Sequence, residues 1–186
     1  MNKKIKRMTT DALLLALLIV SSKLSVPFGP INFTFQILLA LIICLTVDAI
    51  DSLIIMLTYL IMGLLGLPVF ATPTAGISYI YVPSFGFIIG FILMSISMFV
   101  IKKNRLAEKN NKYLYFISCL ILLAIDYICG FVYAIVMIKV LNLIQIDISV
   151  VQILIKFILI FIPFDLIKCI LACVVSRRIN NSTILE

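Results

Sequence analysis

The stretch Gly66–Phe91, GLPVFATPTAGISYIYVPSFGFIIGF, lies between two long apolar runs and decides how the rest of the chain is arranged. Its prolines and glycines exclude one continuous helix over its first two-thirds. Its other side chains are largely apolar and aromatic, unlike those of an ordinary exposed loop. Non-helical backbone is tolerated at membrane depth only where protein buries it or where it lines a cavity. We therefore interpret the stretch as a lid or pocket wall. The alternative is a long connection that packs on the top of a helix bundle.

Apolar residues dominate the whole chain. Of its 186 residues, 64% are hydrophobic and 12% are charged. A soluble domain of this size has no core large enough for so many apolar side chains, so the composition predicts an integral membrane protein. We expect an all-α fold in which residues 1–186 form a single transmembrane domain, a bundle of six transmembrane helices.

Six apolar runs predict these helices. Thr9 or Thr10 is expected to cap the first of them. In the fourth, Gly86 and Gly90 have the GxxxG spacing that lets a neighbouring helix approach closely. The predicted bounds are Met8–Lys23, Phe33–Val47, Ser52–Leu65, Ser84–Ile101, Tyr113–Val140 and Val150–Ser176.

The basic residues indicate the topology. The formal net charge is +7, and eleven of the fifteen Lys and Arg residues fall in three patches. The patches precede the first apolar run, fill the loop Lys102–Lys112 and follow the last run. The positive-inside rule places all three on the cytoplasmic face. We therefore predict a multi-pass protein of the cell membrane with cytoplasmic N- and C-termini and an outer loop Leu141–Ser149. The basic charge is a topology signal and not a nucleic-acid footprint.

The sequence lacks the motifs of several enzyme classes. Histidine is absent, and the five cysteines are scattered through apolar runs without metal-ligand spacing. Neither a metal site, a haem nor a disulfide framework is expected, and no cofactor is predicted. There is no Walker motif and no nucleophile elbow. The chain is therefore not expected to be an enzyme or to hydrolyse ATP by itself.

Ionisable residues inside membrane spans are costly and point to function. Asp165 and Lys168 are three residues apart and therefore share a helix face, just after Pro163, which is expected to kink the last helix. They either meet a polar ligand or form an internal salt bridge. Lys156 lies nine residues before Asp165, on roughly the opposite face. Asp126 is interpreted either as part of the same site or as a polar contact between spans.

Two other pairs have plainer interpretations. Asp48 and Asp51 are expected to cap and solvate a tight turn between the second and third helices. Ala12 and Ala16 lie one turn apart in the first helix, an AxxxA spacing that permits close helix approach. Internal packing is the default interpretation of this alanine pair, and an external helix partner is the alternative.

Four segments resemble the biotin-specific substrate-binding (S) component of energy-coupling-factor vitamin transporters, the BioY family. The most specific is GLPVFA, and Ala12 and Ala16 match the alanine motif with which S components dock on their coupling partner. The resemblance runs through most of the chain, in PFGPINFTFQ (27–36), GLPVFA (66–71), AG...PSFGFIIGF (75–91) and IPFDLIKCILA (162–172). Ala75, Phe85 and Phe164 replace glycines of the family pattern, and these bulkier residues are expected to narrow or reshape the pocket.

The resemblance implies six spans, cytoplasmic termini and a binding site open to the outside. It also implies three kinds of partner: one transmembrane coupling protein, two cytoplasmic ATPase subunits and membrane lipid. No nucleic-acid partner is implied. Biotin suits the residue chemistry, because its ureido ring has two N–H donors and one carbonyl acceptor and its thiophane ring needs apolar walls. The predicted ligand-binding residues are Asp165, Lys168, Phe70, Gly76, Tyr79, Tyr81, Phe85 and Asp126.

Three alternatives stay open. The chain could be an S component for another small vitamin, or a secondary transporter that uses Asp126 or Asp165 as a proton site. An intramembrane enzyme is the third alternative, although no complete catalytic set is present.

Overall fold

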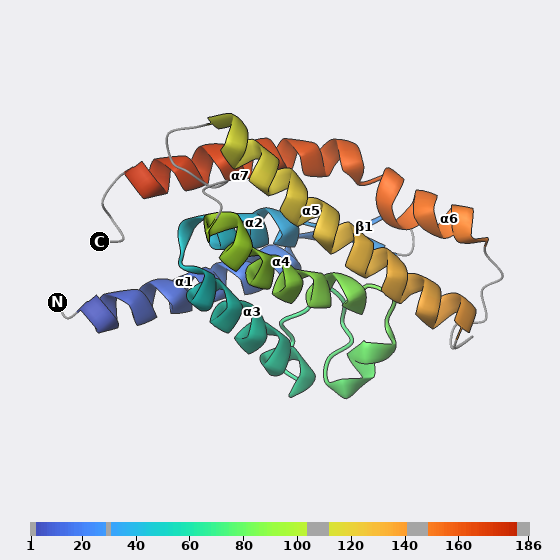
Figure 1. Cartoon of the computed structure of the whole chain (residues 1–186). Helices are drawn as coiled ribbons and strands as arrows, with labels where there is room; N and C mark the ends of the chain where they lie inside the picture. Colours follow the sequence, from blue (N-terminus) through green and yellow to red (C-terminus); the bar gives the residue numbers. More distant parts are fainter. Residues whose placement is uncertain (1–2, 29–30, 104–111, 141–148, 182–186) are drawn as a thin grey trace.

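The computed structural model describes residues 3–28, 31–103, 112–140 and 149–181. They form a bundle of helices with one short β-hairpin, and both ends of the chain lie on the same side (Figure 1). Among these residues, three helical stretches are long and apolar enough to cross a membrane, namely Phe85–Lys103, Lys112–Lys139 and Val150–Asn180. The predicted all-α class is confirmed. The predicted loops Lys102–Lys112 and Leu141–Ser149 lie largely outside the described residues.

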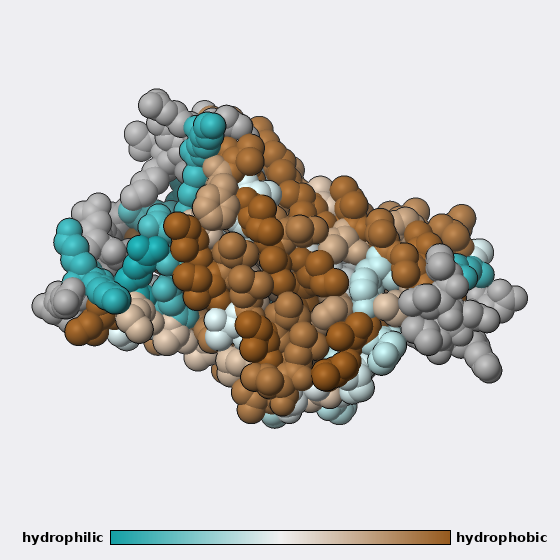
Figure 2. Space-filling view, turned by 60° about the horizontal axis from the view of Figure 1, so that its bottom comes forward, coloured by the Kyte–Doolittle hydropathy of each residue, from teal (hydrophilic) through white to brown (hydrophobic). Residues whose placement is uncertain are grey.

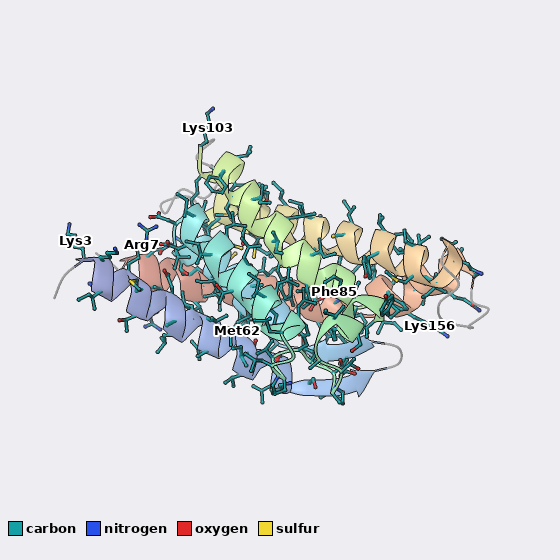
Figure 3. All side chains as sticks on the ribbon, turned by 90° about the horizontal axis from the view of Figure 1, so that it is seen from below. Lys3, Arg7, Met62, Phe85, Lys103 and Lys156 are labelled. Atoms are coloured by element: carbon teal, nitrogen blue, oxygen red, sulfur yellow. The ribbon has the colours of Figure 1, made fainter. Side chains whose placement is uncertain are left out.

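Charged and apolar residues are separated along the molecule. Figure 2 shows a broad hydrophobic surface over its middle and hydrophilic residues gathered towards one end. Lys3, Arg7 and Lys103 lie at that end, far from Lys156 (Figure 3). A central apolar belt with charges beyond it is the surface that a bilayer requires.

Helix α1 (Lys3–Lys23) begins five residues before the predicted Met8. The predicted capping by Thr9 or Thr10 is therefore wrong. Both threonines lie within the helix, where their hydroxyl groups donate to the carbonyl oxygens of Ile5 and Lys6. Basic residues before the apolar run are good helix formers, so the helix continues through them.

Strands β1 (Ser25–Phe28) and β2 (Ile31–Thr34) form an antiparallel hairpin that the sequence did not predict. The hairpin pairs Val26 with Phe33 and leads directly into α2 (Gln36–Thr46). Only 11 residues long, α2 is shorter than the roughly 20 residues that span a bilayer, and it is mostly buried among the other helices.

Helix α3 (Ala49–Leu64) follows a tight turn, as predicted. The interpretation of Asp51 as a solvated turn residue is wrong, because its side chain is buried and accepts two hydrogen bonds from the Arg7 guanidinium of α1. Asp48 occupies the N-cap position of α3 and makes no side-chain capping bond. An ion pair thus joins α1 to α3 at the end of the molecule where the termini lie.

Helices α4 (Phe85–Lys103) and α5 (Lys112–Ile135) make the most extensive helix contact, as the GxxxG spacing predicts. A Cβ atom at Gly86 would overlap Tyr133, and one at Gly90 would overlap the Asp126 carboxylate. Glycine is required at both positions because the α5 side chains occupy the space of its missing side chain.

The last predicted helix is broken. It consists of α6 (Val150–Leu154), the π-helical turn η3 (Ile155–Leu159) and α7 (Ile162–Asn181), and α5 likewise ends in a π-helical turn, η2 (Val136–Val140). Pro163 explains the break, since its ring clashes with the carbonyl group four residues earlier and it donates no hydrogen bond. The predicted kink is confirmed.

The stretch 66–84 folds back over the bundle as a chain segment with one short 3-10 helix, η1 (Ile77–Tyr81). Gly66 and Gly76 have φ angles of 97° and 78°, which favour glycine. The Val69 carbonyl oxygen accepts hydrogen bonds from Ser22 and Tyr59, and Lys23 donates to the Phe70 carbonyl oxygen. These contacts attach the stretch to α1 and α3.

Candidate ligand-binding site

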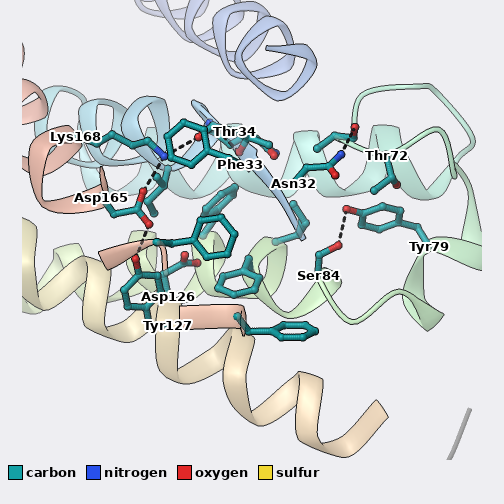
Figure 4. Close-up of a pocket in the computed structure, with 18 residues that line it drawn as sticks. Asn32, Phe33, Thr34, Thr72, Tyr79, Ser84, Asp126, Tyr127, Asp165 and Lys168 are labelled. Atoms are coloured by element: carbon teal, nitrogen blue, oxygen red, sulfur yellow. Dashed lines mark hydrogen bonds and ion pairs between the residues drawn. The ribbon is translucent and has the colours of Figure 1, made fainter. Parts of the chain in front are cut away.

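A cavity of about 90 Å³ lies between the 66–84 stretch and the helices. Strand β2, helices α2, α4, α5 and α7, turn η3 and the stretch itself supply its walls (Figure 4). Phenylalanine and isoleucine side chains form its middle, whereas polar groups gather at two ends. The volume holds several water molecules but is below the ~300 Å³ lower bound typical of pockets for drug-sized ligands.

The charged end of the cavity is built on α5 and α7. Lys168 Nζ lies 2.7 Å from Asp165 Oδ1 and donates to the Thr34 carbonyl oxygen at 2.7 Å. The Tyr127 hydroxyl donates to the second Asp165 oxygen, and Lys168 Nζ lies 3.9 Å from the centre of the Phe33 ring. Asp165 and Lys168 are each 5% exposed. They therefore form the internal salt bridge that was one of the two interpretations, and the pair also lines the cavity.

Local sequence explains why the pair sits at this point. Pro163 forces a new helix to begin beside the cavity, and Asp165 lies in the first turn of α7. A carboxylate is favoured there by the helix dipole. The spacing of three residues then brings Lys168 onto the same face. Lys156 is exposed and does not line the cavity, in agreement with its predicted position on the opposite face.

Asp126 enters the charged end from α5. Its residue is 2% exposed, and its Oδ1 atom has no hydrogen-bond partner among the described residues. Gly90 of α4 lies directly against this carboxyl group. Asp126 thus faces the same cavity as Asp165 but lacks a cation of its own within the described part of the chain.

The neutral end of the cavity is formed by side chains from irregular segments. The hydroxyl oxygens of Tyr79 in η1 and of Ser84 lie 3.3 Å apart. Asn32 of β2 donates to the Ala71 carbonyl oxygen at 3.4 Å. Thr72 also lines this end. Burial raises the pKa of the Tyr79 phenol above its ordinary value, so the phenol keeps its proton and remains a hydrogen-bond donor.

Of the predicted ligand-binding residues, the structure brings Asp165, Lys168, Asp126 and Tyr79 together around the cavity. The other four, all of them described, are not part of its lining. Phe70 stacks on Tyr79 with ring centres 4.1 Å apart and Phe85 packs against its edge, while Gly76 forms a turn and Tyr81 is 58% exposed.

The three residues that replace glycines of the family pattern lie outside the lining of the cavity. Phe85 is buried behind Tyr79, and Phe164 is half-exposed and packs edge-on against Phe33, 5.3 Å between ring centres. Neither they nor Ala75 lines the cavity, so these residues do not narrow it directly, although Phe85 and Phe164 pack on side chains that do line it.

Several lining residues escaped the sequence analysis, notably Asn32, Phe33, Tyr127, Phe157 and Phe161. Asn32 and Phe33 belong to the PFGPINFTFQ segment, whose likeness to a known family was a usable signal. Tyr127 follows Asp126 directly. The two phenylalanines face the cavity because of the break before α7, and no sequence pattern marks them among so many apolar residues.

Ala12 and Ala16 do not line this cavity. Both side chains are exposed on the outer face of α1, together with Leu13, Leu17 and Val20. Internal packing, the default interpretation of the AxxxA spacing, is therefore wrong for the described residues, and the alanines leave a shallow strip on the surface of the helix.

Comparisons with known proteins agree with this architecture. The model of the BioY family matches residues 1–184. The Biotin transporter BioY of Thermotoga maritima is 31% identical over 167 residues, which cover 89% of this chain and 90% of that protein. The Probable biotin transporter BioY of Rickettsia prowazekii is 30% identical over 161 residues, covering 87% and 76%. A crystal structure of the S-component for biotin from an ECF-type ABC transporter superposes with a TM-score of 0.83 and 24% identity, covering 97% of this chain and 94% of that one.

Proposed function

Since this chain belongs to the BioY family, we propose that it is the biotin-binding S component of an ATP-driven energy-coupling-factor uptake transporter. The observation that carries the proposal is the cavity with two polar ends and an apolar middle. Biotin has the same distribution of chemistry, with a ureido ring at one end, a carboxylate at the other and apolar atoms between them. The chain is a transporter subunit and not an enzyme.

The charges orient the ligand. Two carboxyl groups, Asp126 and Asp165, meet one ammonium group, Lys168, at the charged end, and Lys168 is already paired with Asp165. Among the described residues no unpaired cation lines the cavity to receive a ligand carboxylate, whereas two ureido N–H groups and one carbonyl oxygen match two acceptors and one donor. The valerate carboxylate then lies at the neutral end, where Tyr79, Ser84 and Asn32 offer neutral donors.

Ligand identification tests the proposal. The purified protein is denatured to release bound small molecules for mass spectrometry, and the ligand-free protein is titrated with biotin, thiamine and riboflavin. We expect biotin to be released and to bind with the highest affinity. Release of another vitamin, or an absence of biotin binding by protein that still unfolds cooperatively, would overturn it.

The membrane orientation follows from the position of the charges. Six membrane-crossing segments with cytoplasmic termini place Lys3, Arg7 and Lys103 inside and the 66–84 stretch outside. In intact cells, a single cysteine at Thr74 is expected to react with an impermeant maleimide, whereas one at Lys103 reacts only after lysis. Labelling of the Lys103 position from outside would reverse the assignment. Replacement of the five native cysteines provides the background.

The exposed alanines are the proposed docking surface for the transmembrane coupling protein, which carries two cytoplasmic ATPase subunits. Small side chains let a partner helix approach α1 closely. Ala12→Leu together with Ala16→Leu is expected to abolish assembly while biotin still binds the isolated subunit. Ala12→Ser with Ala16→Ser keeps the surface small and serves as the control. Assembly of the leucine variant at the parent level would exclude this surface.

A further inference from the structure

The carboxyl group of Asp126 occupies a space that α4 leaves open for it. Glycine is the only residue type that fits at position 90, because any Cβ atom there would overlap the Asp126 carboxyl group. The close approach of α4 and α5 therefore fixes where the carboxyl group lies, at the charged end of the cavity (Figure 4). A fixed position of this kind suits a group that recognises a ligand.

Asp126 differs from Asp165 in its partners. Asp165 accepts hydrogen bonds from Lys168 and Tyr127, whereas Asp126 Oδ1 has none from the described residues, although only 2% of the residue is exposed. A buried carboxyl oxygen without a donor is unfavourable in any protein and especially within a membrane. Asp126 Oδ1 is packed against Gly90, but the residue also lines the cavity, so a ligand there can supply a donor to the carboxyl group.

We infer that Asp126 accepts a hydrogen bond from one ureido N–H group of the bound vitamin while Asp165 accepts one from the other, so that Asp126 determines specificity for cyclic ureas. This inference rests on the proposed binding of biotin. Asp165 retains the capacity for a further hydrogen bond, since an ionised carboxylate has about four acceptor sites. A ligand with a single N–H donor leaves one of the two carboxyl groups unsatisfied.

Asp126 is expected to have opposite effects on ligand binding and on stability. Replacing Asp126 with leucine removes an unpartnered buried polar group and supplies an apolar side chain of similar size. A buried polar group without a partner is unfavourable, so removing it is expected to be neutral or stabilising. We therefore expect the thermal midpoint of ligand-free Asp126→Leu to equal or exceed that of the parent protein, while its affinity for biotin falls by about 2- to 13-fold, as for loss of one hydrogen bond.

A thermodynamic cycle that combines the Asp126→Leu substitution with changes in the ligand tests whether Asp126 contacts one ureido nitrogen. Biotin and its two isomers methylated at one or the other ureido nitrogen are titrated into the parent protein and into Asp126→Leu. Methylation at one nitrogen is expected to weaken binding to the parent by about 10-fold or more and to weaken binding to the variant only a few-fold. Methylation at the other nitrogen is expected to weaken binding to both proteins equally.

Asp126→Asn is the matched control, because it keeps the size of the side chain and one acceptor oxygen, and it should lose less affinity than Asp126→Leu. If the leucine variant fails to fold, Asp126→Ala completes the cycle. Equal effects of both methylations on parent and variant, or an equal coupling to both nitrogens, would overturn the inference. Failure of the parent to bind biotin would instead overturn the proposed function.

Discussion

The two ends of the cavity are built in different ways. The charged end rests on α5 and α7, long regular helices, and its salt bridge is almost completely buried. The neutral end rests on a β-strand, an irregular chain segment and a 3-10 helix, with hydroxyl and amide groups as its polar atoms. The charged side chains thus come from helices, and the neutral donors come largely from short or irregular segments.

Electrostatics explains this division. A buried charge that loses its partner by even a small movement is strongly destabilised, whereas a hydroxyl group can rotate to another acceptor at little cost. The cavity of about 90 Å³ is also small for a vitamin, so we expect one of its walls to move when the ligand enters. The neutral end is the wall that can yield without separating charges.

The largest effect is expected at the charged end. Asp165→Asn leaves Lys168 buried without its carboxylate partner, a change that costs about 3–5 kcal/mol of stability in other proteins. Removing both charges, as Asp165→Asn with Lys168→Met, should recover much of that stability. Biotin affinity should fall about 10- to 150-fold in each single variant and stay low in the double variant.

Thermal unfolding in detergent and biotin titrations on the three variants separate the two roles of the pair. A double variant that binds biotin like the parent protein would reduce the salt bridge to a purely structural element. The charged end would then no longer differ in function from the ion pair between Arg7 and Asp51 at the other end of the bundle.

An intermediate effect is expected in the mobility of the neutral end. Residues 66–84 should exchange amide hydrogens more slowly when biotin is bound, because the ligand gives their inner side chains a partner. At a ligand concentration of 100 times Kd the slowing is at most about 100-fold, since binding then stabilises the closed state by about 2.7 kcal/mol. The middle of α5 serves as the internal reference. Equal exchange in 66–84 with and without biotin would make the stretch a static cap.

Much of the charged end was predictable from sequence, because ionisable residues in apolar helices are rare and their spacing gives their shared face. Asp165, Lys168 and Asp126 were identified in this way, and Pro163 correctly predicted the break before α7. The contact of Gly90 with Asp126 was predicted only as a close helix approach, since spacing does not identify the neighbouring helix.

The neutral end was less predictable. Aromatic residues in the 66–84 stretch were all plausible wall residues, yet only Tyr79 faces the cavity, with Phe70 and Phe85 packed around it. The choice depends on the positive φ angles at Gly66 and Gly76 and on the anchoring of the Val69 carbonyl group by α1 and α3. Such tertiary contacts leave no periodic pattern in the sequence.

The smallest effect is expected from removing single hydroxyl groups at the neutral end. Tyr79→Phe and Ser84→Ala each delete one neutral hydrogen-bonding group, which contributes about 0.5–1.5 kcal/mol, or about 2- to 13-fold in affinity. Tyr79→Phe keeps the ring that stacks on Phe70, so the fold should be retained. Titration with biotin and with its methyl ester supplies the control, because the ester lacks the carboxylate charge that these donors are proposed to bind. Both variants should therefore discriminate less between acid and ester than the parent does. If they discriminate equally well, the carboxylate lies elsewhere, and the orientation proposed from the charges at the opposite end is wrong.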